Sequence, residues 1–127
     1  MSDKQAIATD RAPAAIGPYN QAIRVGSMLF CSGQIALDPD TQQMVSGGIE
    51  AQTRRVLDNL KAVVEAAGLT LEHVVKTTVF LDNFDDYPTV NAIYGEYFAG
   101  VAPARAAVEV STLPKNALVE IEAIAHQ

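Results

Sequence analysis

Two stretches near the C-terminal end of the chain decide the fold: Pro103-Ala-Arg-Ala-Ala-Val-Glu-Val110 and Leu118-Val-Glu-Ile-Glu-Ala-Ile-Ala125. Polar and apolar residues alternate in both, which is typical of strands. Arg105, Ala107 and Glu109 share one face of the first strand, and Glu120 and Glu122 share one face of the second. If the strands pair with their apolar faces together, we expect Arg105 and the two glutamates to lie on the same side of one sheet. A guanidinium and carboxylates on rigid strands, with the small Ala107 beside them, indicate a small-molecule site, although a surface ion pair on a solvated sheet face gives the same pattern.

Composition narrows the class of protein. A chain of 127 residues, 49% of them hydrophobic, predicts a single domain over residues 1–127 with its own core. The net charge is −6 and no basic run exceeds Arg54-Arg55, so the electrostatic footprint of a nucleic-acid binder is missing. Cys31 is the only cysteine, and His73 and His126 have no ligand-spaced partners, so we expect no disulfide and no metal site. No apolar run approaches the ~20 residues of a membrane span, which favours a soluble, cytoplasmic protein.

The remaining segments predict two helices and three further strands. The sequence predicts a hairpin of two strands, residues 22–25 and 28–35, with its turn at Gly26-Ser27. Gly33 inside the second strand indicates either a bulge or a close approach by a ligand. Residues 49–67 have the apolar stripe of a helix that ends at Gly68. Residues 74–81 read as a strand and residues 84–98 as a second helix. Asn91 lies on the inner stripe of that helix, where tying down a nearby loop is its default role.

The predicted order is therefore β-β-α-β-α-β-β, with a parallel crossover through the first helix. Two helices can cover only one face of such a sheet. The other face is expected to mix apolar residues with these polar ones: Ser32, Arg105, Glu109, Glu120 and Glu122. A face of this kind is too apolar to remain fully wet, which predicts a closed symmetric oligomer with clefts between its subunits.

Several short motifs, in this order and at these spacings, carry a family resemblance. The chain resembles the RidA family of reactive-intermediate (enamine/imine) deaminases, also called the L-PSP endoribonuclease group, from about residue 5 to residue 125. The matching segments are Ile16-Gly-Pro-Tyr19, Ser32-Gly-Gln-Ile35, Asp58-Asn-Leu-Lys-Ala-Val-Val-Glu-Ala-Ala-Gly68, Lys76-Thr-Thr-Val-Phe80, Val90-Asn91 with Tyr94, Pro103-Ala-Arg105, Leu113-Pro114 and Val119-Glu-Ile-Glu-Ala-Ile-Ala125.

The resemblance implies a chorismate-mutase-like α+β fold, with one mixed sheet and two helices on one face. It also implies a homotrimer with three ligand clefts between subunits. In that family pattern Arg105 would hold a substrate carboxylate, and Glu120 would position or deprotonate the attacking water. The cleft would be lined by Tyr19, Ser32, Gly33, Asn91 and Ala107. Position 107 carries a cysteine in many members, and the residue before Pro-Ala-Arg, here Ala102, is often aromatic, so these two positions affect the shape of the pocket.

The activity implied by the resemblance is that of a 2-iminobutanoate/2-iminopropanoate deaminase. Such an enzyme hydrolyses 2-imino acids, or enamines such as 2-aminoacrylate, to 2-keto acids and ammonia. Water adds to an already electrophilic carbon and ammonia leaves, so positioning and one acid/base group are sufficient without a metal or organic cofactor. Two alternatives remain: a non-catalytic, small-carboxylate-binding or chaperone-like trimer, and an endoribonuclease or translation inhibitor. The second conflicts with a net charge of −6.

Overall fold

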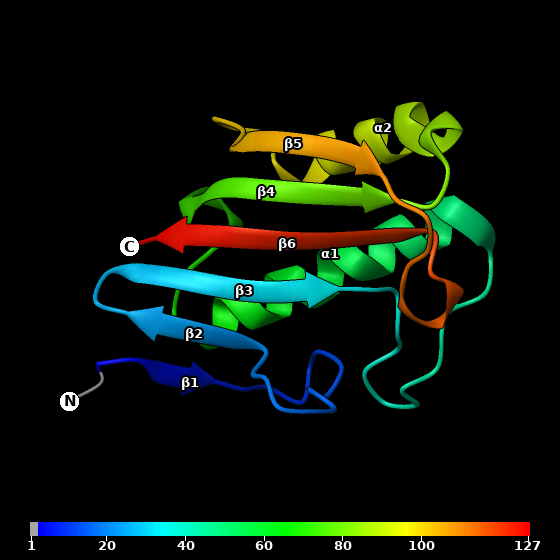
Figure 1. Ribbon diagram of the computed structural model, residues 1–127. Coiled ribbons are helices and arrows are strands. Elements are labelled where there is room, and N and C mark those ends of the chain that lie inside the picture. Colours follow the sequence, from blue (N-terminus) through cyan, green and yellow to red (C-terminus); the bar gives the residue numbers. More distant parts are fainter. Residues whose placement is uncertain (1–2) are drawn as a thin grey trace.

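The computed structural model describes residues 3–127 and contains one mixed six-stranded sheet with the strand order β1-β2-β3-β6-β4-β5 (Figure 1). Neighbouring strands are antiparallel except for β4 and β5, which run parallel. β5 is therefore one edge of the sheet and β1 the other. The strands are β1 Gln5–Ile7, β2 Ala22–Val25, β3 Met28–Gln34, β4 Val74–Leu81, β5 Ala104–Glu109 and β6 Val119–His126.

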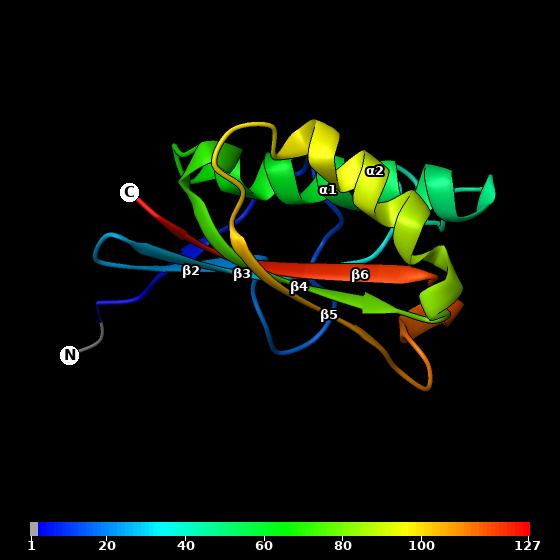
Figure 2. The ribbon, with the colours of Figure 1, turned by 90° about the horizontal axis from the view of Figure 1, so that it is seen from above.

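Both α-helices, α1 Gly48–Ala66 and α2 Tyr87–Tyr97, cover the same face of the sheet (Figure 2). Short 3-10 turns precede β4, α2 and β6: η1 Leu71–His73, η2 Phe84–Asp86 and η3 Pro114–Asn116. The core lies between helices and sheet, where each fully buried aliphatic side chain contributes about 1.5–3 kcal/mol. Its fully buried members include Leu29, Val56, Leu57, Leu60, Val63, Leu81, Val119 and Ile121. The predicted α+β fold with two helices on one face is confirmed.

Local signals in the sequence correspond to the observed turns. Val25 pairs with Met28, and Gly26 has a φ of 57°, the positive value that a tight hairpin turn requires at its first central residue. After α1, Gly68 has a φ of 81°, and its N–H donates to the carbonyl of Glu65 at 2.9 Å. The helix therefore ends at the predicted glycine because a left-handed residue can satisfy the last carbonyls.

Three elements differ from the sequence-based expectation. A short first strand, β1, pairs with β2 at the sheet edge, and the sequence patterns did not predict it. The second helix begins with the 3-10 turn η2 and becomes α-helical only at Tyr87. β5 and β6 do not pair with each other, because β4 lies between them. The crossover through α1 does connect parallel strands, β3 and β4, but β6 is inserted between these two.

The position of β4 separates the charged residues that we expected to share a face. Arg105 is in register with Thr77, which is buried toward the helices, whereas Glu120 is in register with Phe80 on the opposite face. Residues directly opposite each other in a ladder point to the same side. Arg105 and Glu109 therefore lie on the helix side and Glu120 and Glu122 on the open side, so the prediction of one shared face is wrong.

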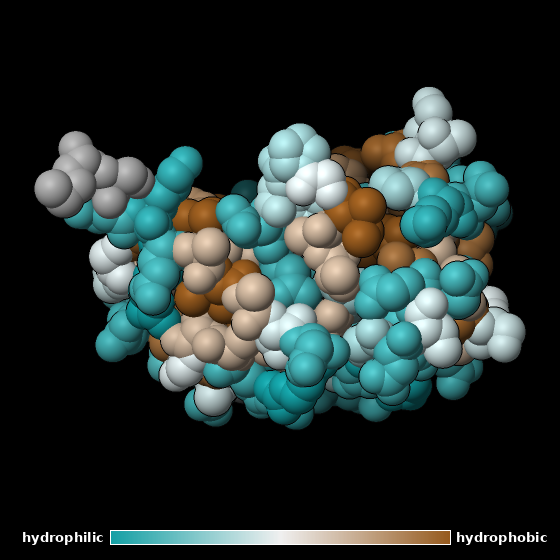
Figure 3. Space-filling model, turned by 90° about the horizontal axis from the view of Figure 1, so that it is seen from below, coloured by the Kyte–Doolittle hydropathy of each residue, from teal (hydrophilic) through white to brown (hydrophobic). Residues whose placement is uncertain are grey.

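The open side of the sheet carries hydrophobic residues at its surface. Phe30 on β3 is 44% exposed and Val108 on β5 is 42% exposed, and Glu120, Glu122 and Ile124 lie on the same face. Figure 3 shows hydrophobic residues reaching the surface toward this side, above a mostly hydrophilic helix side. No helix among residues 3–127 is long and apolar enough to cross a membrane.

Candidate active site

The guanidinium of Arg105 is held by aromatic residues of α2. Its Nη2 donates a hydrogen bond to the hydroxyl oxygen of Tyr87 at 2.7 Å. Its Cζ lies 4.8 Å from the ring centroid of Tyr94 and 5.5 Å from that of Tyr87. The side chain is half-buried on the edge strand β5, so the cation is fixed in place while it remains accessible from the edge of the sheet.

Arg105 is not part of an ion pair within the described residues. The ion pairs of residues 3–127 are Arg11–Glu65 and Arg54–Glu96. Glu109, the acidic residue on the same face of β5, instead accepts the backbone N–H of Phe84 on η2 at 2.8 Å. The alternative in which Arg105 neutralises Glu109 or Glu120 therefore finds no support within one chain, and the guanidinium has charge available for an anionic ligand.

Asn91 and Ala107 border the same region as Arg105. Asn91 lies one turn of α2 after Tyr87, is half-buried and makes no side-chain hydrogen bond among residues 3–127. The loop-tying role expected for its amide is therefore not seen. Ala107 shares the face of Arg105 and packs against the core beside Val79. We refer to Asn91, Arg105 and Ala107 together as the Arg105 half-site.

Glu120 lies on the other side of the sheet, directly over Gly33. A Cβ added to Gly33 would overlap the Glu120 carboxyl group, with its Cδ only 2.9 Å away. The pairing of β3 with β6 shifts register between Cys31 and Gln34, which confirms a bulge around Gly33. Desolvation by burial, and then the charge of Glu122, raise the pKa of Glu120 above its ordinary value. A carboxyl with a raised pKa suits proton transfer near neutral pH.

Ser32 and Tyr19 lie near Gly33, on the side of the sheet that carries Glu120. The Ser32 hydroxyl donates to the carbonyl of Asn20 at 2.5 Å, which ties the loop that carries Tyr19 to β3. Tyr19 is exposed and lines, together with Gly33, a cavity of about 220 Å³. We refer to Tyr19, Ser32, Gly33 and Glu120 as the Glu120 half-site.

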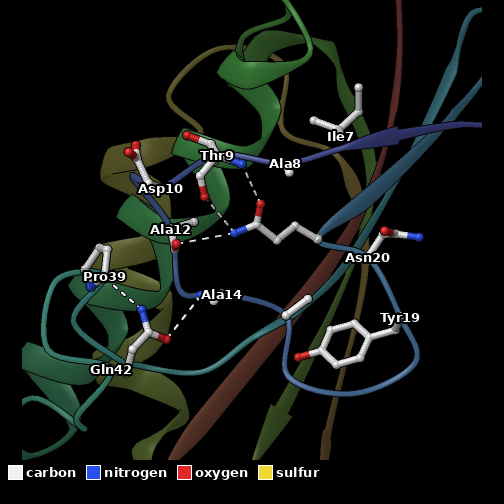
Figure 4. Close-up of a pocket in the computed structure, with 12 residues that line it drawn as sticks. Ile7, Ala8, Thr9, Asp10, Ala12, Ala14, Tyr19, Asn20, Pro39 and Gln42 are labelled. Atoms are coloured by element: carbon white, nitrogen blue, oxygen red, sulfur yellow. Dashed lines mark hydrogen bonds between the residues drawn. The ribbon is translucent and has the colours of Figure 1, made fainter.

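A larger cavity, of about 550 Å³, lies beside the loop that joins β1 to β2 (Figure 4). Two of its polar side chains bind the backbone of this loop: Gln21 Nε2 donates to the carbonyl of Pro13 at 2.8 Å, and Gln42 Oε1 accepts from the N–H of Ala14 at 3.2 Å. In Figure 4, Tyr19 projects from this loop, and Pro39 and Gln42 lie on a separate segment that faces it near Ala14. The glutamines pin the loop, and this cavity includes only Tyr19 of the expected site residues.

The two half-sites do not meet within one chain, because they lie on opposite faces of the sheet and β4 separates their strands. A small substrate could contact both only if a second copy brought its Glu120 half-site to the β5 edge of the first. Cys31 belongs to neither half-site: it is buried, and burial raises the pKa of its thiol to about 12. Such a thiol behaves as a small hydrophobic group rather than as a nucleophile.

Comparison with known proteins identifies the family. The sequence matches the family described as Endoribonuclease L-PSP over residues 9–127. It is 49% identical over 124 residues to the mouse 2-iminobutanoate/2-iminopropanoate deaminase, a match that covers 98% of this chain and 92% of the mouse protein. The chain belongs to the RidA (L-PSP) family. A RutC family protein of Pyrococcus horikoshii is 53% identical over 98% of both chains. The crystal structure of RidA from the Antarctic bacterium Psychrobacter sp. PAMC 21119 has a TM-score of 0.94 and 44% identity, and covers 97% of this chain and 99% of its own.

One residue of this RidA-family chain that no sequence pattern singled out contacts Arg105. Tyr87 lies on the helical stripe that also carries Asn91 and Tyr94, and its hydroxyl reaches across to β5. The stripe could have suggested proximity to Asn91, because residues four apart lie on one helix face. Its contact with Arg105 depends on how α2 packs against the sheet, which no local pattern specifies.

Proposed function

We propose that this protein hydrolyses 2-imino acids and their enamine tautomers, such as 2-aminoacrylate, to 2-keto acids and ammonia. The observation that carries the proposal is the Arg105 guanidinium, which is half-buried, oriented and without a carboxylate partner among the described residues. A planar guanidinium can grip a carboxylate with two parallel hydrogen bonds and so fix the position of the neighbouring C=N carbon. The mouse relative that bears the name of this activity supports the assignment.

In this proposal Glu120 acts on water. With its pKa raised by burial, the Glu120 carboxyl can accept a proton from the attacking water and return it to the departing nitrogen. The carbon passes through a tetrahedral carbinolamine, and the C–N bond breaks to release ammonia. Tyr19, Ser32 and Gly33 would form the wall on the Glu120 side, and Asn91 and Ala107 the wall beside Arg105. The reaction is redox-neutral and needs no metal or organic cofactor.

We further propose that the active unit is a homotrimer with one cleft at each interface. The separation of the half-sites on opposite faces supports a cleft between copies, and the apolar residues of the open sheet face supply a surface for the contact. Three copies arranged head to tail around one axis would complete three equivalent sites. We place the protein in the cytoplasm, and a net charge of −6 disfavours RNA as a substrate.

The test replaces Arg105. Arg105→Ala removes hydrogen bonds worth about 1.5–3 kcal/mol each to a charged group, so 2-keto acid release from freshly generated 2-aminoacrylate should fall to near background. Arg105→Lys should recover only part of the activity, because an ammonium restores the charge without the fork. Turnover and melting temperature are measured on the same sample. A stable Arg105→Ala protein with wild-type turnover would refute the proposal, and a wild type that binds pyruvate without hydrolysing imines would be a carboxylate-binding protein instead.

A further inference from the structure

The contacts around Arg105 restrain its guanidinium in different ways: some hold its position and one also holds its rotation. The ring of Tyr94 lies 4.8 Å from Cζ, and a cation over a ring face is attracted to it but can still rotate above it. The hydroxyl of Tyr94 cannot stop that rotation, because it is buried in a 2.6 Å hydrogen bond with the hydroxyl of Thr77. The hydrogen bond from Arg105 Nη2 to Tyr87 is directional, so it selects one rotation of the guanidinium.

Tyr87 is itself held in place relative to β5. Its ring stacks on Phe84 with centroids 4.8 Å apart and planes inclined by 10°. The backbone N–H of Phe84 donates to Glu109 Oε1 at 2.8 Å. Glu109 and Arg105 belong to the same strand and face. β5 therefore carries Arg105 and, through the contact of Glu109 with Phe84, also holds the Tyr87 ring whose hydroxyl binds Arg105.

We propose that Tyr87 is a positioning residue, whose hydroxyl sets the angle at which Arg105 presents its two parallel N–H groups to the substrate carboxylate. This inference rests on the proposed function, in which Arg105 binds that carboxylate. A bidentate hydrogen bond requires two N–H groups of the guanidinium to point at the two carboxylate oxygens, whereas a flexible arginine side chain samples many rotations. Fixing the rotation before binding lowers the entropy that binding must remove, so the effect should fall on affinity more than on the chemical step.

The variant Tyr87→Phe isolates the hydroxyl, because the stacked ring remains. We expect KM for the imine and Kd for pyruvate, titrated calorimetrically, to rise about tenfold, with a smaller change in kcat and an unchanged melting temperature. Tyr97→Phe is the matched control on the same helix. Its hydroxyl donates to Asp58 Oδ1 at 2.8 Å, away from β5, so its loss should leave KM and Kd unchanged.

A double-mutant cycle separates positioning from a merely structural role. In an Arg105→Lys background, Tyr87→Phe should have no further effect on pyruvate affinity, because an ammonium has no plane to orient. The inference is overturned if Tyr87→Phe binds and turns over as the wild type does. It is also overturned if the variant only lowers the melting temperature, or if the affinity loss is equal in the Lys background. A wild-type protein that neither binds pyruvate nor hydrolyses imines would overturn the proposed function together with this inference.

Discussion

Glu120 and Glu122 share one face of β6 but lie in different environments. Glu120 is half-buried over Gly33, whereas Glu122 is exposed and borders a shallow cavity together with Lys76. The pKa of Glu120 is raised by desolvation first and by the nearby charge of Glu122 second. Two chemically identical groups, two residues apart, therefore lie in different surroundings, and the raised pKa of the half-buried Glu120 makes it the candidate general base or acid.

This difference leads to a matched pair of variants. Glu120→Gln should lower turnover of 2-aminoacrylate by about 10²–10⁴-fold, the usual contribution of a general acid or base, with little change in pyruvate affinity. Glu122→Gln should retain most of the activity. Keto-acid release and calorimetric titration measure the two quantities. Equal losses in both variants would indicate that the two glutamates form a structural charge cluster.

Thermal stability distinguishes lost chemistry from lost folding in the Glu120→Gln variant. A carboxyl whose pKa is higher in the folded than in the unfolded state costs stability as the pH rises above its unfolded pKa, about 4.3. Replacing it with a neutral amide removes this cost. The melting temperature of Glu120→Gln should therefore exceed that of the wild type at pH 7, and the two should converge well below pH 4. A less stable variant at pH 7 would contradict this account.

At the scale of the elements, the bulge in β3 is what lets Glu120 approach the strand backbone. The φ of Gly33 is not positive, so an alanine there meets no backbone strain. Its Cβ would instead overlap the Glu120 carboxyl group. The glycine therefore permits the close approach of the Glu120 side chain rather than an unusual backbone conformation.

Gly33→Ala should accordingly displace the Glu120 carboxyl group. We expect turnover to fall by up to roughly a hundredfold, because small misplacements of a reacting group are costly. Stability should change little, because the added Cβ meets the end of a flexible side chain that can rotate away. Gly95→Ala on α2 is the control, since a Cβ there meets nothing within 4 Å. It should raise stability by about 0.5–1 kcal/mol. Turnover and chemical denaturation test both variants, and an active Gly33→Ala protein would contradict the assignment.

Alternation and turn residues predicted most elements of the fold, including the hairpin at Gly26 and the end of α1 at Gly68. These signals are local, so they could be read without knowing which strands pair. A period of two shows that Arg105 and Ala107 share a face, but not whether that face meets the helices. That depends on the insertion of β4 between β5 and β6, a contact between segments far apart in the chain.

The candidate site, too, depends on contacts between segments far apart in the chain, which local sequence patterns do not reveal. The charged residues could be selected by type, and the resemblance to the RidA family supplied their proposed roles. Their division into two half-sites could not be predicted, because it follows from the strand order. The contact between Tyr87 and Arg105 was missed for a related reason: a helical stripe indicates which residues face inward but not which strand they reach.

At the scale of the whole molecule, the half-sites and the open face lead to one expectation about assembly. A head-to-tail contact that brings Glu120 of one copy to the β5 edge of the next also covers apolar residues such as Phe30 or Val108. Because such a contact uses two different surfaces, it closes into a ring only at a fixed number of copies. Light scattering should give about three times the chain mass of 13.5 kDa.

Complementation tests whether each site is shared between copies. Arg105→Ala and Glu120→Gln chains, coexpressed with different tags and purified through both, would form mixed trimers. Each parent should be inactive, but a site that takes Arg105 from a Glu120→Gln chain and Glu120 from an Arg105→Ala chain is intact. Every mixed trimer selected through both tags contains one such site, so about one site in three should recover wild-type turnover. If both residues acted within one chain, every site would lack one of them and the mixture would remain as inactive as its parents.

The control is a mixture of Arg105→Ala with an Arg105→Ala, Glu120→Gln double variant, in which no pairing restores a site. Activity in that control, or none in the first mixture of confirmed hetero-oligomers, would contradict a cleft built from two copies.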